Sequence, residues 1–415
     1  MSMAGWSRIL GAAARKLSFA GTLVLAVAIA GSGIASAANQ SVAGVKKEEG
    51  GYDTDAPNAI LIDADSGSVL FEKNADDATA PSSMMQLMTV LVVFDKLAAG
   101  EIKLSDEYTV SENAWRRGGA PSGGPTMFAA IHSKVKVEDL LRGAVILNAN
   151  DACIALAEGI AGNERVFAQL LATRAREVGL ANASFANASG LPDFANRMSV
   201  RDIARLARFI IKTYPEQYKL FNERDYTWNK IHQTNRNPLL NAYASADGLK
   251  SGFSKDGGYG MVGTAVQNGL RLIVAINGMD DPDDRLTESK KLLEWGFRNF
   301  ESKSLFGAAQ LLGYAKVFGG TSSSVALASR EPIKLLVQKN GSDKLLARIV
   351  YTGPVRAPIA RGAQVGVVRV WRGNNLAVEQ PLYATEAVGT GSMTRRAFDT
   401  ASELVIGWVR SAVKL

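Results

Sequence analysis

The stretch Pro81-Ser-Ser-Met-Met-Gln-Leu-Met-Thr89 decides how this 415-residue chain is interpreted. Residues 83–97 are densely apolar and flanked by a proline and a glycine, which predicts a buried helix. Residues three apart on a helix share one face, so Ser83 and Gln86 are expected to face the same site. A serine followed at this spacing by a lysine is a nucleophile with its own base. Here the third residue is a glutamine, whose amide accepts no proton at neutral pH.

The composition sets broad limits on fold and partners. With 47% hydrophobic and 21% charged residues, the chain can bury at least one large core and is expected to fold as two domains. Its net charge of +7 suits an anionic surface such as lipid head groups or an acidic polymer. Lysine and arginine are spread along the chain without interleaved aromatic residues, so no nucleic-acid partner is predicted.

The first 37 residues have the pattern of a signal peptide. Arg8, Arg15 and Lys16 precede residues 17–30, which carry no charge, and Ala35-Ser-Ala37 offers the small residues that signal peptidase accepts. We therefore expect residues 1–37 to be removed on export, leaving a polar leader over residues 38–55. The alternative is an uncleaved anchor helix.

Residues 56–304 alternate between strand and helix patterns and predict an α+β domain. A hairpin opens the domain at residues 59–71, around an Asp-Ser-Gly turn. Helical periodicity dominates from residue 137 to 214. The period then changes to that of antiparallel strands, at residues 248–252, 261–266 and 270–276, before a closing helix at 286–297.

The last quarter of the chain predicts a separate β domain over residues 305–388. Short strands are expected at residues 333–338, 345–351, 365–371 and 376–382. Residues 389–415 follow as an amphipathic helix with several basic residues and Trp408 on its apolar side. This helix is expected to lie on a membrane surface; the alternative is packing against the β domain.

Histidine and cysteine are too scarce for the common hydrolytic and metal sites. The chain has two histidines, His132 and His232, and neither has metal-ligand neighbours at suitable spacing. A Ser-His-Asp triad and a zinc site are therefore not expected, and no cofactor is predicted. Cys153 is the single cysteine, so an intrachain disulfide is impossible.

Three boxes in order resemble a known family. Residues 81–89 resemble the Pro-x-Ser-x-x-Lys-x-Met-Thr box of the low-molecular-mass penicillin-binding proteins, which are serine D-Ala-D-Ala carboxypeptidases. Asn148-Ala-Asn-Asp-Ala152 is similar to the second box, usually Ser-Gly-Asn-Asp-Ala, and Asp247-Gly-Leu-Lys-Ser-Gly252 to the third, usually Lys-Thr-Gly. Both flanking domains resemble the family, so the likeness covers residues 55–415. It implies a penicillin-binding-protein/β-lactamase-like transpeptidase fold with a small C-terminal β domain and a terminal amphipathic helix.

The resemblance implies a peptidoglycan stem peptide ending in D-Ala-D-Ala as substrate, with β-lactams as its mimics. Ser83 would attack the peptide, and water would hydrolyse the acyl-enzyme. In the third box, which ends at Gly252, Lys250 and Ser251 would hold the substrate carboxylate or polarise the site, and Arg285 would assist with the carboxylate. Asn150 would bind the peptide amide. The oxyanion hole would come from the backbone N–H groups of Ser83 and Phe253. The implied location is the periplasm, at the outer face of the cytoplasmic membrane.

Individually these residues have ordinary interpretations as caps, surface charges or ion-pair partners, and their joint order carries the resemblance. Two departures bear on activity: Gln86 replaces the lysine, and Asn148 replaces a serine hydroxyl implied to relay protons. Phe253 also replaces a histidine. Loss of one member of a nucleophile–base unit costs roughly 10⁴ to 10⁶ in turnover, unless Lys250 has become the base. Three hypotheses remain: a weakened hydrolase, a non-catalytic stem-peptide module that regulates cell-wall synthesis, and an envelope protein with an unrelated ligand.

Overall fold

The computed structural model describes residues 52–400, apart from 340–343, 373–374, 395 and 398–399. The predicted signal peptide and residues 401–415 of the predicted terminal helix lie outside these ranges. In the described part, no helix combines the length and apolar character needed to cross a bilayer.

A five-stranded antiparallel sheet organises the first domain. The strand order is β2-β1-β9-β8-β7, so the opening hairpin pairs with the last strand of the domain and β7 lies at an edge. The bounds are β1 (Asn58–Asp63), β2 (Val69–Lys73), β7 (Ala246–Ser254), β8 (Gly258–Gln267) and β9 (Leu270–Met279). The predicted hairpin and the three predicted strands are confirmed, each one or more residues longer.

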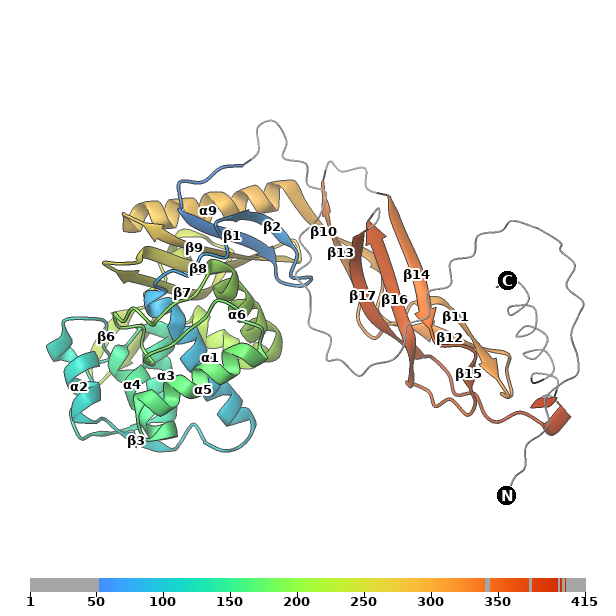
Figure 1. The fold of residues 1–415 in the computed structure, drawn as a ribbon, viewed down its shortest axis with the longest axis horizontal. Helices are drawn as coiled ribbons and strands as arrows, with labels where there is room; N and C mark the ends of the chain where they lie inside the picture. Colours follow the sequence, from blue (N-terminus) through green and yellow to red (C-terminus); the bar gives the residue numbers. More distant parts are fainter. Residues whose placement is uncertain (1–51, 340–343, 373–374, 395, 398–399, 401–415) are drawn as a thin grey trace, which may run out of the picture. The chain divides into compact units, whose positions relative to one another are not determined.

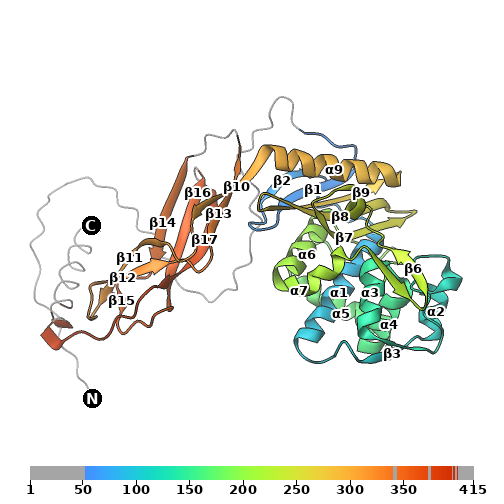
Figure 2. The ribbon, with the colours of Figure 1, turned by 180° about the vertical axis from the view of Figure 1, so that it is seen from behind.

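Helices cover both faces of this sheet (Figures 1 and 2). On one face lies α9 (Pro282–Asn299), and on the other lie α6 (Val200–Thr213) and the helices beneath it. The strands are buried on both sides because successive side chains point to opposite faces. In β9, Leu272, Val274 and Ile276 join the core under α9, whereas Ile273 and Ala275 join the core on the opposite face.

The helical layer is built around one central helix, α1 (Gln86–Ala98), whose residues up to Phe94 are buried. The prediction of a regular helix from Ser83 is wrong by one turn, because a 3₁₀ turn, η1 (Ser82–Met85), precedes α1. The helices that contact α1 are α3 (Val137–Ile146), α4 (Asn150–Ala161), α5 (Glu164–Glu177) and α6. Further out, α2 (Glu112–Gly118) packs on α4, and α7 (Pro215–Tyr218) follows α6, whereas α8 (Leu239–Ala242) contacts β7 and joins the core under α9. Two short strand pairs complete the domain: β3 (Glu107–Thr109) with β4 (Lys134–Lys136), and β5 (Asp225–Trp228) with β6 (Ile231–Thr234).

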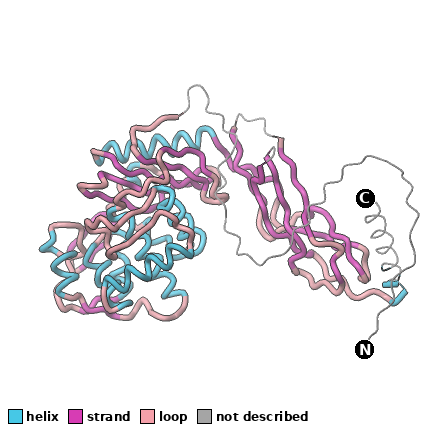
Figure 3. Tube along the Cα trace, in the orientation of Figure 1, coloured by secondary structure: helices cyan, strands magenta, loops and turns pink. Residues whose placement is uncertain are grey.

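The remaining described residues form β structure, drawn in magenta in Figure 3. β10 (Phe300–Phe306) pairs with β13 (Ile333–Gln338), and a six-stranded sheet has the order β14-β16-β17-β12-β11-β15. Its strands are β11 (Leu311–Phe318), β12 (Ser324–Ala328), β14 (Leu345–Tyr351), β15 (Val355–Arg356), β16 (Gln364–Arg372) and β17 (Asn375–Ala384). The four predicted strands correspond to β13, β14, β16 and β17.

A close backbone approach fixes the turn that carries Ser83. Ser82 has a φ of +51°, which is uncommon for a residue with a side chain. Gly190 has a φ of +80°, and a Cβ atom there would lie 2.1 Å from the Ser82 carbonyl oxygen. The loop at Gly190 therefore supports η1 only because the residue has no side chain.

We expect Gly190→Ala to destabilise the protein by about 2 to 4 kcal/mol, because it combines an unfavourable positive φ with a clash against backbone. Urea unfolding of the variant and the wild type measures the difference. Gly100→Ala is the matched control, since Gly100 also has a positive φ but a Cβ there meets nothing within 4 Å. Equal losses in the two variants would contradict the role of the close approach.

Candidate acyl-transfer site

The candidate nucleophile lies where η1 meets the edge strand β7. Ser83 is half-buried between the buried residues Ser82 and Met84. A Cβ at Gly252 would lie 3.0 Å from the Ser82 Cβ and 3.1 Å from the Ser83 nitrogen. The glycine of the third box therefore lets β7 approach the backbone of the candidate nucleophile, and the two predicted site residues are brought together.

Gln86 lies fully buried behind this turn and donates into a cage of three oxygens. Its Nε2 is 2.9 Å from the Ser189 carbonyl oxygen, and 3.2 Å from both the Asn148 carbonyl oxygen and Asn150 Oδ1. An amide nitrogen carries two hydrogens, whereas a lysine ammonium carries three. The Gln86 Oε1 atom is buried and has no hydrogen-bond partner among the described residues. The cage thus offers one acceptor more than the amide can satisfy.

Asn148 connects the loop between α3 and α4 to β7. It has a φ of +52°, a conformation that asparagine tolerates better than most residues, and its side chain is buried. Its Nδ2 donates to the Ser251 carbonyl oxygen at 2.8 Å. Asn148, which stands where the family's second box has a serine, is therefore hydrogen-bonded to the backbone of the third box at Ser251.

Lys250 is fully buried and its Nζ donates to two carbonyl oxygens of α3, at Ala144 (2.5 Å) and Val145 (3.4 Å). Burial lowers the pKa of Lys250 to about 7. No hydrogen bond joins Lys250 to Ser83 among the described residues. The neighbouring thiol of Cys153 is also buried, which raises its pKa to about 12, so it behaves as part of the core.

Ser251 anchors β7 to a loop that the sequence did not single out. Its Oγ donates to the Arg236 carbonyl oxygen at 2.7 Å, and the Arg236 N–H donates to the Ile146 carbonyl oxygen at 3.0 Å. The exposed Arg236 therefore borders the site. Arg236 was not predicted from the sequence. The only signal that could have identified it is its position a short distance before the third box, because the residues around it form no recognisable motif.

Aromatic rings and a guanidinium stack beside the third box. Phe253 pairs with Tyr259 across β7 and β8, and their ring centroids are 4.2 Å apart. Arg285 belongs to α9, and its guanidinium carbon lies 5.5 Å from the centroid of the Tyr259 ring. Arg285 is 9% exposed, burial lowers its pKa, and its Nε has no hydrogen-bond partner among the described residues.

The structure decides against the ion-pair alternative for Arg285. Asp281 caps α9 by accepting from the N–H groups of Asp283 and Asp284. In the described ranges, no carboxylate forms an ion pair with Arg285 or with Lys250. Buried charges are normally paired, and Arg285 and Lys250 instead donate to backbone carbonyl oxygens, Arg285 to that of Gly252 and Lys250 to those of Ala144 and Val145.

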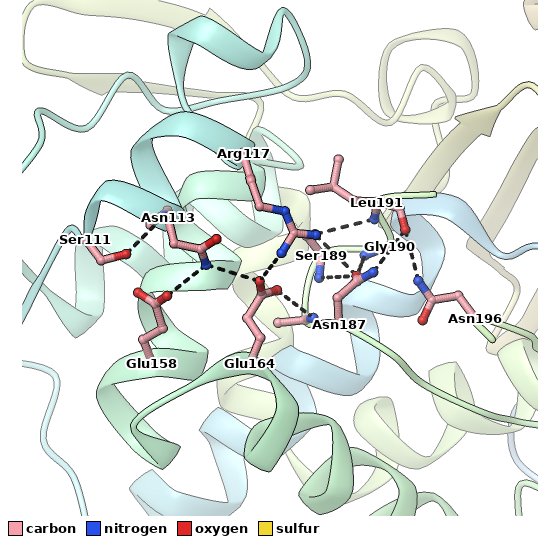
Figure 4. Close-up of polar contacts among 12 residues, drawn as sticks. Ser111, Asn113, Arg117, Glu158, Glu164, Asn187, Ser189, Gly190, Leu191 and Asn196 are labelled. Carbon is pink, nitrogen blue, oxygen red and sulfur yellow. Dashed lines mark hydrogen bonds and ion pairs between the residues drawn. The ribbon is translucent and has the colours of Figure 1, made fainter. Parts of the chain in front are cut away.

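A polar network holds the loop that carries Ser189 (Figure 4). The buried carboxylate of Glu164 accepts from Arg117 Nη1 at 2.9 Å and from the Ala188 N–H at 3.3 Å. Asn187 Oδ1 accepts from the Gly190 N–H at 2.8 Å. Residues of α2, α5 and this loop meet here, which no local pattern in the sequence shows. The network fixes one of the three oxygens around Gln86.

Two family models match the chain. The model described as D-alanyl-D-alanine carboxypeptidase matches residues 43–281, more than half of the chain. The model described as penicillin-binding protein 5, C-terminal domain, matches residues 300–390. The chain belongs to the D-alanyl-D-alanine carboxypeptidase family.

Relatives and solved structures agree with the family. The chain is 36% identical to the D-alanyl-D-alanine carboxypeptidase DacC of Escherichia coli over 348 residues, covering 83% of this chain and 87% of that protein. It is similar to penicillin-binding protein 5 of Haemophilus influenzae, with 33% identity, a TM-score of 0.71, and coverage of 81% and 98%. A Streptococcus pneumoniae structure described as a peptidoglycan synthesis regulatory factor (PBP3) has 25% identity, a TM-score of 0.75, and coverage of 81% and 100%.

The resemblance and the fold class are thereby confirmed: this is a serine D-Ala-D-Ala carboxypeptidase family member with the penicillin-binding-protein fold and a C-terminal β domain. The family acts on D-Ala-D-Ala peptides of peptidoglycan and binds β-lactams. In the described part of the chain, no group of His, Cys, Asp or Glu is arranged to hold a metal ion.

Lys250→Met should remove a pH dependence of stability. Burial lowers the pKa of Lys250 from its ordinary value near 10.5 to about 7, so between these values the unfolded chain binds a proton that the folded chain has released. Stability at this position therefore rises as the pH rises from about 7 towards 10.5, is lost as the pH falls back towards 7, and changes little below 7, where both states are protonated. We expect the free energy of unfolding of the wild type, relative to Lys250→Met, to grow by about 1 to 2 kcal/mol from pH 7 to 8.5.

Urea unfolding at several pH values measures this difference. Lys255→Met is the matched control, because Lys255 is exposed on the turn after β7 and its replacement should give a pH-independent difference. The same flat profile for Lys250→Met would show that the buried ammonium does not titrate as its surroundings indicate.

Proposed function

We propose that this chain recognises peptidoglycan stem peptides ending in D-Ala-D-Ala and forms an acyl-serine at Ser83 only slowly. The observation that carries the proposal is the buried amide of Gln86 at the position of the family's lysine. An amide can orient a hydroxyl but accepts no proton at neutral pH. Removing the base from a serine–base unit costs about 10⁴ to 10⁶ in turnover, or about 5 to 8 kcal/mol of barrier.

Recognition is proposed to rest on groups that remain. The backbone N–H groups of Ser83 and Phe253 would hold the developing oxyanion, and Asn150 would bind the peptide amide. The terminal carboxylate would be held by Ser251 and the buried cations Lys250 and Arg285. The two cations support this assignment because neither has a carboxylate partner among the described residues.

The proposed reaction uses no metal or cofactor. Ser83 Oγ would attack the carbonyl carbon of the penultimate D-Ala, and its proton would pass to water. The amine of the terminal D-Ala would then gain a proton from water and depart. Water would then hydrolyse the ester. Lys250 is a poor replacement base in this state, because its Nζ is bonded to the carbonyl oxygens of Ala144 and Val145.

A second candidate is a non-catalytic stem-peptide or scaffolding protein that regulates cell-wall synthesis. The Asn148 to Ser251 hydrogen bond favours it, because it fills the place of the proton-relaying hydroxyl with a group bonded to β7. The similar S. pneumoniae structure is described as a regulatory factor. Acylation at Ser83 separates the two candidates.

We further propose that the protein is exported to the periplasm after removal of residues 1–37. The exported chain would have a polar leader at residues 38–55, a transpeptidase-like domain at 56–304 and a β domain at 305–388. Residues 389–415 would attach the protein peripherally to the outer face of the cytoplasmic membrane. These proposals rest on the charge and hydropathy patterns of the sequence.

A fluorescent penicillin should label the purified protein about 10⁴-fold more slowly, or slower still, than it labels a relative with the lysine, because Ser83 must lose its proton without a positioned base. Labelling is followed on denaturing gels over time. Ser83→Ala should abolish the label, and Ser82→Ala, the adjacent hydroxyl, should keep it. Label that survives Ser83→Ala would contradict Ser83 as the nucleophile, and no label at all would favour the non-catalytic candidate.

Gln86→Lys together with Asn148→Ser should raise the second-order acylation rate by about 10²- to 10⁴-fold, because a neutral lysine amine can accept the Ser83 proton and the Gln86 amide cannot. Stopped-time labelling with the fluorescent penicillin measures the rate. Gln310→Lys is the control, since Gln310 is exposed in the C-terminal β region and its change should leave the rate as it was. No gain in the double variant would refute the lysine-base argument for this cleft.

A further inference from the structure

The outer edge of β7 already binds one amide. β7 is the last strand of its sheet, and no strand of the described residues pairs with its outer side. The Ser251 carbonyl oxygen accepts the Asn148 amide from that side, as it would accept an added strand. Backbone groups two residues apart in a strand point the same way, so the N–H and C=O of Phe253 also face this edge.

The proposed function places the substrate on this edge, and the inference rests on it. A peptide whose scissile carbonyl accepts from the Phe253 N–H pairs its penultimate residue with Phe253. In an antiparallel pair the next residue of the peptide, its C-terminal one, then lies opposite Gly252. Gly252 has no side chain to occupy the space beside it.

Stereochemistry decides which face the terminal side chain occupies. An L-residue opposite Phe253 would point to the same face as Phe253, and an L-residue after it would point to the other face. A D-residue reverses this direction, because its side chain and hydrogen are exchanged. The side chain of a C-terminal D-residue therefore falls on the Phe253 face, between Ser251 and Phe253.

Two aromatic rings lie on that face, beside the guanidinium of Arg285. Phe253 is 53% exposed and stacks on Tyr259, with ring centroids 4.2 Å apart, so one side of its ring is supported and the rest is open. A phenyl ring has no hydrogen-bond donor or acceptor, so it can contribute only apolar contact. The side chain of the peptide would contact Phe253 from the neighbouring strand position, as Phe253 contacts Tyr259.

We propose that Phe253 is a specificity-determining residue that seats the side chain of the terminal D-residue. The cleft then prefers stem peptides that end in a bulky apolar D-amino acid over those that end in D-Ala. The methyl group of D-Ala covers little of the phenyl ring, whereas a branched aliphatic side chain covers more of it.

The test is equilibrium binding of acetyl-Lys-D-Ala-D-Xaa peptides to the Ser83→Ala protein, measured by titration calorimetry. D-Leu at the last position should bind about 5- to 10-fold more tightly than D-Ala, as expected for three partly buried carbons. L-Leu should show no such gain, because its side chain points away from Phe253. Adding Phe253→Ala or Phe253→His should bring the D-Leu to D-Ala ratio close to one.

Phe194→Ala is the matched control, since Phe194 is 87% exposed and does not belong to β7 or β8; the D-Leu preference should persist in it. Thermal denaturation shows that each variant is folded. D-Ala binding without a D-Leu preference, or a preference that survives both Phe253 changes, overturns the inference and leaves the proposed function intact. Absence of binding by every peptide overturns both.

Discussion

The buried amide of Gln86 is the constraint on which the rest of the site depends. Three oxygens from three segments converge on its Nε2, and two of them are carbonyl oxygens whose positions are set by backbone. Two N–H groups cannot fully satisfy three acceptors, and the amide oxygen beside them is buried without a partner. The surroundings therefore match a three-donor ammonium better than the side chain present. The unpartnered amide oxygen costs stability at this point.

Removing a positive charge at this position changes the electrostatics of the whole cleft. A buried ammonium at residue 86 would lower the proton affinity of neighbouring groups by repulsion, and the neutral amide does not. The remaining cations near β7, Lys250 and Arg285, are buried and have no carboxylate partner among the described residues. In the proposed function these groups hold the carboxylate at the end of a peptide, and the neutral amide of Gln86 cannot take up the Ser83 proton.

Patterns within short stretches of sequence predicted the strands and the positions of the three boxes. Alternating apolar residues located β7, β8 and β9, and the three boxes lie in segments that the structure brings together, with Gly252 beside the Ser83 backbone and Asn148 bonded to Ser251. Long-range contacts were beyond reach: Ser189 contributes its carbonyl oxygen through a loop held by Glu164, about which spacing says nothing. The 3₁₀ turn before α1 was also missed, because it depends on the contact between Gly190 and Ser82. Strands β10 and β11 escaped prediction because their exposed residues break the apolar runs.

Recognition and proton transfer are carried by different parts of this structure. Most of the groups proposed for recognition are backbone N–H groups and buried side chains, and the substituted positions contact them: Gln86 donates to Asn150, and Asn148 donates to the Ser251 carbonyl oxygen. In the proposed function, proton transfer depends instead on single side chains. A protein of this architecture can therefore lose its chemistry and keep its cleft, and the aromatic pair beside that cleft can go on shaping which peptide ends it accepts. The glycines at 190 and 252 are consistent with this division, because both serve the position of the Ser83 turn, which recognition needs as much as catalysis does.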